Sequence, residues 1–295
     1  MVACGVLMKS DVHHIRKPAW LGRPLPTDPA FSRIRFLLEE EHLHTVCQEA
    51  RCPNQGECFS RGTAVFLILG DSCTRRCRFC AVTQGTPEQP DPGEPERVAA
   101  AADRMSLDYI VVTSVTRDDL ADGGAGVFAE TIRCLRSRRP SARIEVLIPD
   151  FQGDEAALRT VLEARPDVLN HNLEAVARLY PEVRPQAVYA RSLELLRRTG
   201  AIAPGTTVKS GLMLGLGECP EEVEAALHDL YDAGCRILTL GQYLQPKRAC
   251  LPVSRYIPPA EFDEWREAAL DIGFAQVASG PLVRSSYHAE ELFGG

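Results

Sequence analysis

Six of the eleven cysteines in this 295-residue chain fall into two closely spaced groups. They are the C-x4-C-x5-C group Cys47, Cys52 and Cys58, and the C-x3-C-x2-C group Cys73, Cys77 and Cys80. Three thiolates on one short loop can bind three irons of a [4Fe–4S] cluster and leave the fourth iron open to a small ligand. A second group of three indicates a second cluster, so the spacing favours a redox enzyme with two iron–sulfur centres.

Two other uses of grouped cysteines are less consistent with this spacing. Structural zinc sites usually draw four ligands from paired C-x2-C or Cys/His arrangements, whereas each group here offers three cysteines with unequal gaps. One zinc ion could still combine cysteines of both groups, with His42 or His44 in reserve. Disulfide frameworks belong to small exported proteins. This chain is long enough for a full core, and its first residues do not have the order of an export signal.

Charge and hydropathy limit the classes of partner. The net charge of −7 and the pI near 5.6 argue against general nucleic-acid binding, which needs a basic stripe. The longest apolar runs stop short of the roughly eighteen residues that could span a bilayer. We therefore expect a cytoplasmic protein in a reducing compartment that binds neither nucleic acid nor a membrane.

From residue 63 onward, strand-like and helix-like segments alternate. The apolar, strand-like runs are 64–69, 108–114, 143–149, 168–172, 207–214 and 236–241. The helix-like stretches between them are about 95–105, 125–138, 154–164, 191–199 and 221–233. Pro220 is typical of a helix start, and Gly200 and Gly234 are typical of helix ends. Six such β/α units with apolar strands predict a parallel sheet covered by helices.

The same pattern divides the chain into three parts. Residues 1–60 look irregular apart from a short helix at 31–41, and form an N-terminal extension that carries one cysteine group. Residues 61–250 hold the β/α units. Residues 251–295 form a short C-terminal extension with a helix at 259–272 and a strand at 275–278. Parallel barrels place their chemistry on the loops after the strands, which is where the second cysteine group lies.

The segment Cys73-Thr74-Arg75-Arg76-Cys77-Arg78-Phe79-Cys80 resembles the signature of the radical S-adenosylmethionine superfamily. Further segments resemble the lipoyl synthase family within it: 49–54, 112–120, 122–125, 170–174, 209–213, 215–218 and 284–289. The combination of the C-x4-C-x5-C group with Arg284-Ser285-Ser286-Tyr287 is highly specific. The resemblance runs from about residue 40 to residue 289, and implies a partial (β/α)6 TIM-type barrel with both extensions.

Roles of individual residues follow from this resemblance. It implies that Cys73, Cys77 and Cys80 hold a reducing cluster, and that Cys47, Cys52 and Cys58 hold an auxiliary one. A serine of the Arg284-Ser285-Ser286 segment would be the fourth ligand of the auxiliary cluster, and we favour Ser285 over Ser286. Candidate contacts to S-adenosylmethionine are Thr113, Ser114, Asn170, Asn172, Arg184, Lys209 and Glu218. Arg184 and Lys209 are candidates for its carboxylate, and Asn172 could instead cap the following helix.

The resemblance also implies a reaction, the insertion of two sulfur atoms at C6 and C8 of a protein-bound octanoyl group. These carbons are unactivated, so acid–base or nucleophilic side chains cannot break their C–H bonds, and cofactors must carry the chemistry. The implied route uses a 5′-deoxyadenosyl radical from S-adenosylmethionine, with the auxiliary cluster as sulfur donor. The implied partners are an octanoylated lipoyl carrier domain or H-type carrier protein, an electron donor such as flavodoxin or ferredoxin, and an iron–sulfur cluster carrier.

Two positions depart from the family pattern, since Cys250 stands where histidine is more usual and Gln186 where glycine is. A basic rim of Arg75, Arg76 and Arg78 is a candidate for meeting an acidic carrier. Nearby alternatives are biotin synthase, or a methylthiotransferase, which would be expected to carry an RNA-binding module. A non-catalytic iron–sulfur or zinc protein, such as an electron carrier, is an alternative from another class, although it would be expected to supply four ligands for each cluster.

Overall fold

The computed structural model describes residues 16–22, 28–61 and 63–293, and its centre is an eight-stranded sheet with the order β1-β2-β5-β6-β7-β8-β9-β10. The strands are β1 (His44–Thr45), β2 (Val65–Ile68), β5 (Tyr109–Ser114), β6 (Arg143–Leu147), β7 (Val168–Asn170), β8 (Thr207–Leu214), β9 (Ile237–Gln242) and β10 (Gln276–Gly280). Neighbours pair in parallel except at β1, which is antiparallel to β2. The predicted six parallel strands and the seventh that follows them are confirmed.

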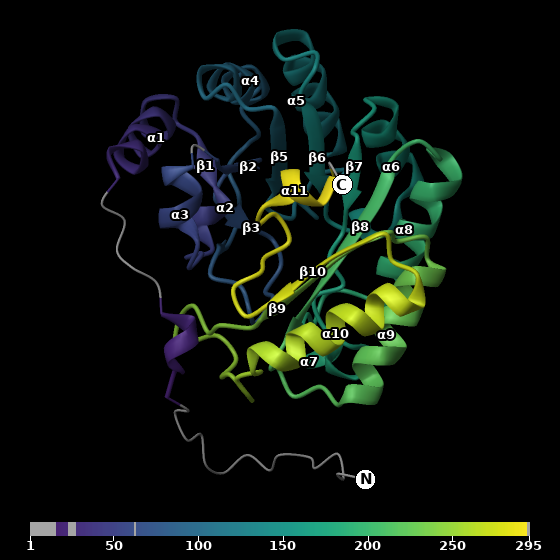
Figure 1. Ribbon diagram of the computed structural model, residues 1–295. Helices are drawn as coiled ribbons and strands as arrows, with labels where there is room; N and C mark the ends of the chain where they lie inside the picture. Colours follow the sequence, from purple (N-terminus) through teal and green to yellow (C-terminus); the bar gives the residue numbers. More distant parts are fainter. Residues whose placement is uncertain (1–15, 23–27, 62, 294–295) are drawn as a thin grey trace.

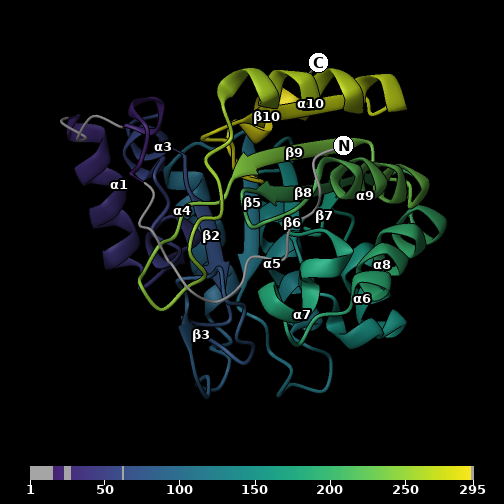
Figure 2. The same cartoon turned by 90° about the horizontal axis from the view of Figure 1, so that it is seen from below.

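Helices surround this sheet on its outer side (Figure 1). They are α4 (Glu94–Arg104), α5 (Ala125–Arg138), α6 (Glu155–Glu163), α8 (Tyr189–Ile202), α9 (Pro220–Asp232) and α10 (Pro259–Ile272). Figure 2 shows the succession β8, β9 and β10, with α10 beside β10. Because β1 and β10 are the two ends of the strand order, the sheet forms an open, partial barrel.

Local chemistry explains where several helices begin and end. Asp154 caps α6 by accepting a hydrogen bond from the amide of Ala156 at 2.8 Å. Gly273 ends α10 in the left-handed region at φ 118°, where a glycine has no steric cost. The expectation for Gly200 was wrong, because α8 continues through it to Ile202. A glycine inside a helix costs only about 1 kcal/mol, which the packing of α8 can offset.

The N-terminal extension is more regular than the sequence indicated. It contains η1 (Ala19–Leu21), α1 (Pro29–Glu40), α2 (Val46–Glu49) and α3 (Gln55–Ser60), and β1 joins the sheet. Most of these elements have two to six residues, too few to show a periodic pattern. Residues 1–15 and 23–27, also expected to be irregular, lie outside the described residues.

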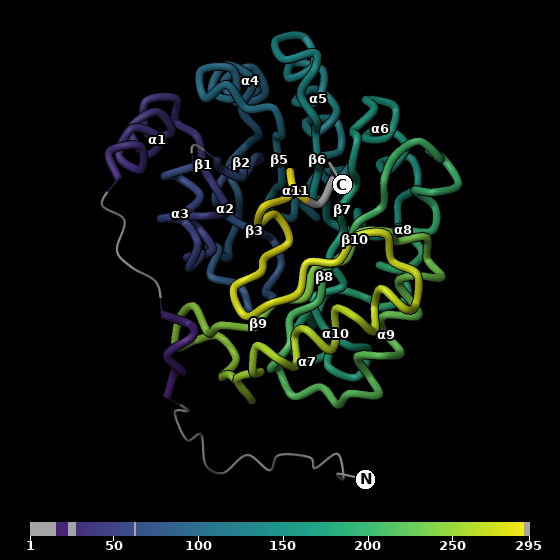
Figure 3. Tube along the Cα trace, viewed as in Figure 1, coloured from purple at the N-terminus to yellow at the C-terminus, as the bar shows by residue number. Residues whose placement is uncertain are grey.

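The C-terminal segment returns to the middle of the barrel after β10 and ends in α11 (Ala289–Phe293), as Figure 3 shows. Shorter elements line the barrel rim: β3 (Ser72–Cys73), β4 (Thr83–Gln84), η2 (Phe151–Gly153), η3 (Ala177–Leu179) and α7 (Tyr180–Val183). Nine cysteines of the described residues are free, including all six grouped ones. None of the helices in the described part is long and apolar enough to cross a membrane.

Candidate cluster and cofactor site

One cavity of about 540 Å³ collects the residues that the sequence singled out. All six grouped cysteines line it, together with Ser285 and Ser286. Its walls include residues at or just after the carboxyl ends of β2, β5, β6, β7, β8 and β9, which is the end of a parallel barrel that carries chemistry. The N-terminal and C-terminal extensions close it from the side, so residues from 47 to 286 meet in one site.

The loop with the second cysteine group leaves β2 through a tight backbone turn. Leu69 has a positive φ of 69° and Gly70 one of 91°. Both polar groups of Leu69 are held: its amide donates to the carboxylate of Glu94 at 2.8 Å, and its carbonyl accepts from the guanidinium of Arg117 at 3.3 Å. A β-carbon on a left-handed residue costs energy, and these two contacts stabilise the turn that directs the chain to Cys73.

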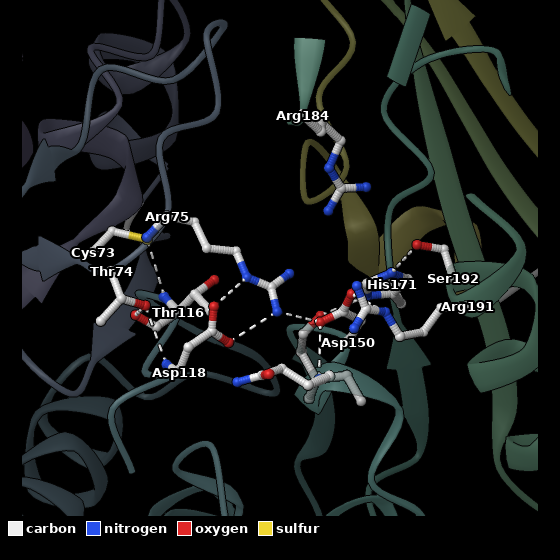
Figure 4. Close-up of polar contacts among 12 residues, drawn as sticks. Cys73, Thr74, Arg75, Thr116, Asp118, Asp150, His171, Arg184, Arg191 and Ser192 are labelled. Carbon is white, nitrogen blue, oxygen red and sulfur yellow. Dashed lines mark hydrogen bonds and ion pairs between the residues drawn. The ribbon is translucent and has the colours of Figure 1, made fainter. Parts of the chain in front are cut away.

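The next part of the loop is bonded to the segment that follows β5 (Figure 4). The amide of Thr74 donates to the carbonyl of Thr116 at 3.0 Å. The amides of Arg75 and Thr116 both point at the sulfur of Cys73, at 3.4 and 3.3 Å. Around an iron–sulfur cluster, amide donors to a cysteine sulfur influence the reduction potential of the cluster.

The buried thiols are poor acids without a cation beside them. Burial, with a smaller contribution from the neighbouring cysteines of each group, raises the pKa of Cys47 and of Cys80 to about 12. Burial and the charge of Cys52 likewise raise the pKa of Cys58 to about 11. A bound metal group would neutralise these thiolates, since metals deprotonate coordinating thiols.

Among residues 16–22, 28–61 and 63–293, no three Cys, His, Asp or Glu side chains converge on a point where one ion could sit. A [4Fe–4S] cluster does not need this convergence, because each thiolate binds a different iron. The donor set of three thiols on each side of one cavity therefore fits two clusters.

The first cysteine group is tied to the C-terminal segment. Cys47 lies on α2 and Cys58 on α3. Between them, the side-chain amide of Asn54 donates to the carbonyl of Leu282 at 2.7 Å. The hydroxyl of Tyr287 donates to Glu57 on α3 at 2.8 Å. These contacts bring Ser285 and Ser286 to the cavity wall that holds this cysteine group.

Four of the residues expected to contact S-adenosylmethionine line the cavity: Thr113, Ser114, Asn172 and Arg184. Three of them carry a buried polar atom with no hydrogen-bond partner among the described residues, namely Ser114 Oγ, Asn172 Oδ1 and Arg184 Nε. Buried polar atoms are normally paired, so these three atoms are suited to hydrogen bonds with a polar ligand.

The other three expected contacts do not line the cavity. Lys209 forms an ion pair with Glu145 at 2.9 Å inside the barrel, and the side-chain amide of Asn170 donates to the same carboxylate at 2.9 Å. Glu218 accepts hydrogen bonds from the amides of Gly215 and Leu216, at 2.5 and 2.9 Å, and so stabilises its own loop. The charged groups of Lys209 and Glu218 are thus paired within this chain, whereas Asn170 keeps one buried oxygen, Oδ1, without a partner among the described residues.

Glu174 and His171 also line the cavity, although they were not among the candidate contacts to S-adenosylmethionine. Burial raises the pKa of Glu174, whose backbone has a positive φ of 68° and whose carboxylate accepts from Asn172 at 3.0 Å. His171 is fully buried, with its pKa lowered to about 4 by burial and by the charge of Arg184. Both lie in the segment 170–174, which is one of the stretches that resemble the family. This resemblance is the sequence signal that could have identified them.

The expected basic rim is wrong at Arg75. This side chain is 4% exposed and bound to Asp118 and Asp150, so it cannot meet a partner protein. Arg76 is exposed, and Arg78 is about half exposed beside Glu182.

The two departures from the family pattern both contact the cysteine loop. Gln186 accepts a hydrogen bond from the amide of Arg76 at 2.6 Å, and the thiol of Cys250 donates to the carbonyl of Cys80 at 3.4 Å.

Comparison with known proteins gives concordant matches. Residues 67–230 match the model of the radical SAM superfamily, and residues 4–52 match that of the N-terminal domain of lipoyl synthase. The chain is 56% identical over 285 residues to lipoyl synthase of Desulfotalea psychrophila, covering 97% of this chain and 95% of that protein. It is 56% identical over 278 residues to lipoyl synthase of Methylococcus capsulatus, covering 94% and 86%.

Solved structures share the fold at low sequence identity. Methylornithine synthase superposes with a TM-score of 0.53 at 14% identity, covering 88% of this chain and 83% of that one. SuiB of Streptococcus suis, bound to its precursor peptide SuiA, gives 0.56 at 11% identity, covering 72% and 48%. These likenesses support the open β/α barrel alone.

Proposed function

The chain belongs to the lipoyl synthase family of the radical SAM superfamily, and from this premise we propose how its residues serve the insertion of sulfur at C6 and C8 of a protein-bound octanoyl group. A radical SAM enzyme of this family uses S-adenosylmethionine and a [4Fe–4S] cluster. We assign that cluster to Cys73, Cys77 and Cys80. A second cluster is assigned to Cys47, Cys52 and Cys58, with Ser285 as its fourth ligand.

A single observation carries this assignment: both cysteine groups and Ser285 line one cavity. The residues that would hold a radical-forming cluster and those that would hold a sulfur-donating cluster must lie within reach of the same eight-carbon chain. Two sites on opposite faces of the molecule could not do this. A serine oxygen is a harder ligand for iron than a thiolate and leaves it more easily, which suits a cluster that is taken apart.

The unpartnered polar atoms support a place for S-adenosylmethionine. Ser114, Asn172 and Arg184 would contact its polar groups, with Thr113 beside them. The guanidinium of Arg184 donates to the carbonyls of Asn172 and Leu173, at 2.9 and 3.1 Å, which fixes its direction at the cavity. Arg184 is thus a preorganised cation for the carboxylate of S-adenosylmethionine.

When bound, the two clusters and S-adenosylmethionine supply the one-electron chemistry and the sulfur that unactivated carbons require. The chain itself holds the substrate and excludes water. Leu67, Leu147 and Leu212 contribute apolar walls suited to an octanoyl chain. The C-terminal segment covers the side of the cavity at the first cysteine group, which keeps a reactive carbon away from solvent.

Unpaired cations support an acidic carrier protein as partner. Lys17 and Arg51 line the cavity and are exposed, and Lys247 lies 3.3 Å from the carbonyl of Ala81, another lining residue. None of these three cations forms an ion pair with another described residue, although the chain carries a net charge of −7. We assign them, in place of Arg75, to contacts with an octanoylated lipoyl carrier domain or H-type carrier protein.

Two further partners follow from the cofactors. A reductant such as flavodoxin or ferredoxin would supply electrons, and a cluster carrier would restore the auxiliary cluster after each turnover. Such partners, and the free thiols of the six grouped cysteines, are consistent with a cytoplasmic setting.

The test counts iron and product in anaerobically reconstituted protein. We expect about eight irons per chain, and a mass gain of two sulfurs on an octanoylated carrier peptide given S-adenosylmethionine and a reductant. Cys47→Ala should lower the count to about four irons and abolish sulfur insertion, while 5′-deoxyadenosine is still formed. Cys73→Ala should abolish both products.

Cys235→Ala is the matched control, because Cys235 is a buried thiol outside the cavity. It should keep about eight irons and full activity. A wild-type count of four irons, or 5′-deoxyadenosine without any sulfur-containing product, would contradict the proposal.

A further inference from the structure

Arg75 is a buried cation in the middle of the cysteine loop. Its guanidinium donates to both carboxylate oxygens of Asp118, at 2.7 and 2.9 Å, and to Asp150 at 2.5 Å (Figure 4). Its side chain is 4% exposed and that of Asp150 is 0% exposed. An arginine on a short loop between metal ligands would usually be solvated, so its burial against two carboxylates requires an explanation.

The two carboxylates belong to different parts of the barrel. Asp118 follows β5, and Asp150 follows β6. Asp150 also lies 3.0 Å from the guanidinium of Arg191 on α8, and accepts from the amide of Gln152 at 3.1 Å. Asp150 is therefore itself fixed in place, and Arg75 connects the cysteine loop to a rigid part of the barrel.

A second set of contacts holds the same loop at Thr74. Thr74 is bonded to Thr116, and the amide of Asp118 donates to the hydroxyl of Thr74 at 3.1 Å. The loop is thus held at Thr74 by hydrogen bonds of its amide and its hydroxyl, and at Arg75 by charge. Thr74 and Arg75 are the first two residues after Cys73. A planar, bidentate guanidinium restricts orientation as well as distance.

We propose that Arg75 is a positioning residue, which, with Asp118 and Asp150, holds the cysteine loop in its cluster-binding conformation and places a fixed positive charge beside the cluster. This inference rests on the proposed assignment of Cys73, Cys77 and Cys80 to a cluster. The guanidinium of Arg75 is held by Asp118 and Asp150. It acts through the loop backbone and through its charge.

Two consequences separate this role from a merely structural one. First, the loop is preorganised before any iron arrives, so loss of Arg75 exposes its thiols selectively. Second, the charge affects electron transfer. Arg75→Gln leaves two carboxylates near the cluster, which disfavours the extra electron and lowers the reduction potential. Asp150→Asn removes a negative charge and raises the potential, so the two variants shift it in opposite directions.

The first experiment measures thiol alkylation rates, residue by residue, in full-length cluster-free protein. Arg75→Gln should speed alkylation of Cys77 and Cys80 about tenfold and leave Cys47, Cys52 and Cys58 unchanged. Arg75→Lys keeps the charge but loses the bidentate geometry, and should lie between wild type and Arg75→Gln. An equal increase at all six cysteines would show general unfolding and overturn the proposal.

The second experiment is a redox titration, followed by electron paramagnetic resonance, of the cluster at Cys73, Cys77 and Cys80 in reconstituted protein. The matched control is Arg136→Gln, since Arg136 forms a 2.5 Å ion pair with Asp167 at the other end of the strands. Arg136→Gln should leave the potential and the alkylation rates as in wild type.

The two experiments distinguish this inference from the proposed function. Unchanged potentials in Arg75→Gln and Asp150→Asn, or shifts in the same direction, overturn the role of Arg75 while the cluster assignment stands. Absence of a reducible cluster in wild-type protein would instead overturn the proposed function.

Discussion

The ammonium group of Lys209 lies 2.9 and 3.0 Å from the two carboxylate oxygens of Glu145, and both side chains are fully buried. Lys209 is on β8 and Glu145 on β6, with β7 between them, so the pair crosses the barrel interior. Tyr109 and Asn170 donate to the same carboxylate, at 2.7 and 2.9 Å. The charge of Lys209 is therefore paired within the fold, and Lys209 is not among the residues that line the cavity.

Lys209→Met should accordingly reduce stability and leave ligand binding intact. Removal of one partner leaves Glu145 buried and uncompensated, at a cost of about 3–5 kcal/mol in the free energy of unfolding. Denaturant unfolding measures this cost, and equilibrium dialysis measures binding of S-adenosylmethionine. The double variant Lys209→Met, Glu145→Gln should lose less stability than Lys209→Met. Weakened binding without a loss of stability would restore the role that the sequence indicated for Lys209.

Gly241→Ala should displace the C-terminal segment from the cavity. A β-carbon at Gly241 would collide with the backbone carbonyl of Val283, two residues before Ser285. We expect the iron count to fall from about eight to about four per chain, because the auxiliary cluster loses its fourth ligand. Gly200→Ala is the control, since nothing lies within 4 Å of the added carbon, and it should be neutral or stabilising by up to about 1 kcal/mol. An unchanged iron count in Gly241→Ala would argue against Ser285 as a ligand.

Arg61→Gln should loosen the C-terminal segment without unfolding the protein. Arg61 contacts Glu290 at 3.2 Å and Glu291 at 3.1 Å, and all three side chains are substantially exposed. Exposed pairs each contribute about 0–1 kcal/mol, so the free energy of unfolding should change little. Hydrogen exchange of residues 284–291 should become faster, and 0.5 M salt should have a similar effect on wild-type protein. Arg133→Gln, which breaks a 2.9 Å surface pair with Glu130, should not alter exchange there.

The free energy of unfolding should decrease as the pH is lowered, because of His171. Burial, and then the charge of Arg184, lower its pKa to about 4, while the imidazole contacts the Ile148 carbonyl at 2.8 Å and Ser192 at 2.9 Å. In the unfolded chain the imidazole of His171 takes up a proton near pH 6.5, whereas in the folded chain it stays neutral at that pH. The contribution of neutral His171 to the free energy of unfolding is therefore complete above pH 6.5. It declines as the pH falls toward 4, by an amount on the order of 3 kcal/mol.

Denaturant unfolding of cluster-free protein at pH 7.5 and pH 5 measures this dependence, because iron is then absent from both states. His171→Asn should flatten the difference between the two pH values. A His171→Asn protein with the same pH dependence as wild type would assign it to other groups.

Much of the architecture followed from sequence. Apolar runs bounded by helix-like stretches located β8 at 207–214 and α5 at 125–138 with the bounds that the structure shows. Spacing alone selected the six grouped cysteines, because thiolates close together in sequence lie close together in space on any short loop. The alternation of β and α segments also determined that the loop of Cys73 lies at the carboxyl end of the barrel.

The tertiary structure decided what charged and polar side chains do. Arg75 and Lys209 carry the same charge in sequence, and both were expected to face a ligand or a partner. Their partners Asp150 and Glu145 lie 75 and 64 residues away along the chain, so no local pattern could reveal the pairing. That Ser285 lines the same cavity as Cys47, Cys52 and Cys58 likewise depends on the fold of the whole chain. Local sequence determined the strands, helices and cysteine loops, because these depend on neighbours in the chain. Partners of buried charges depend on contacts between distant segments, which only the folded chain establishes.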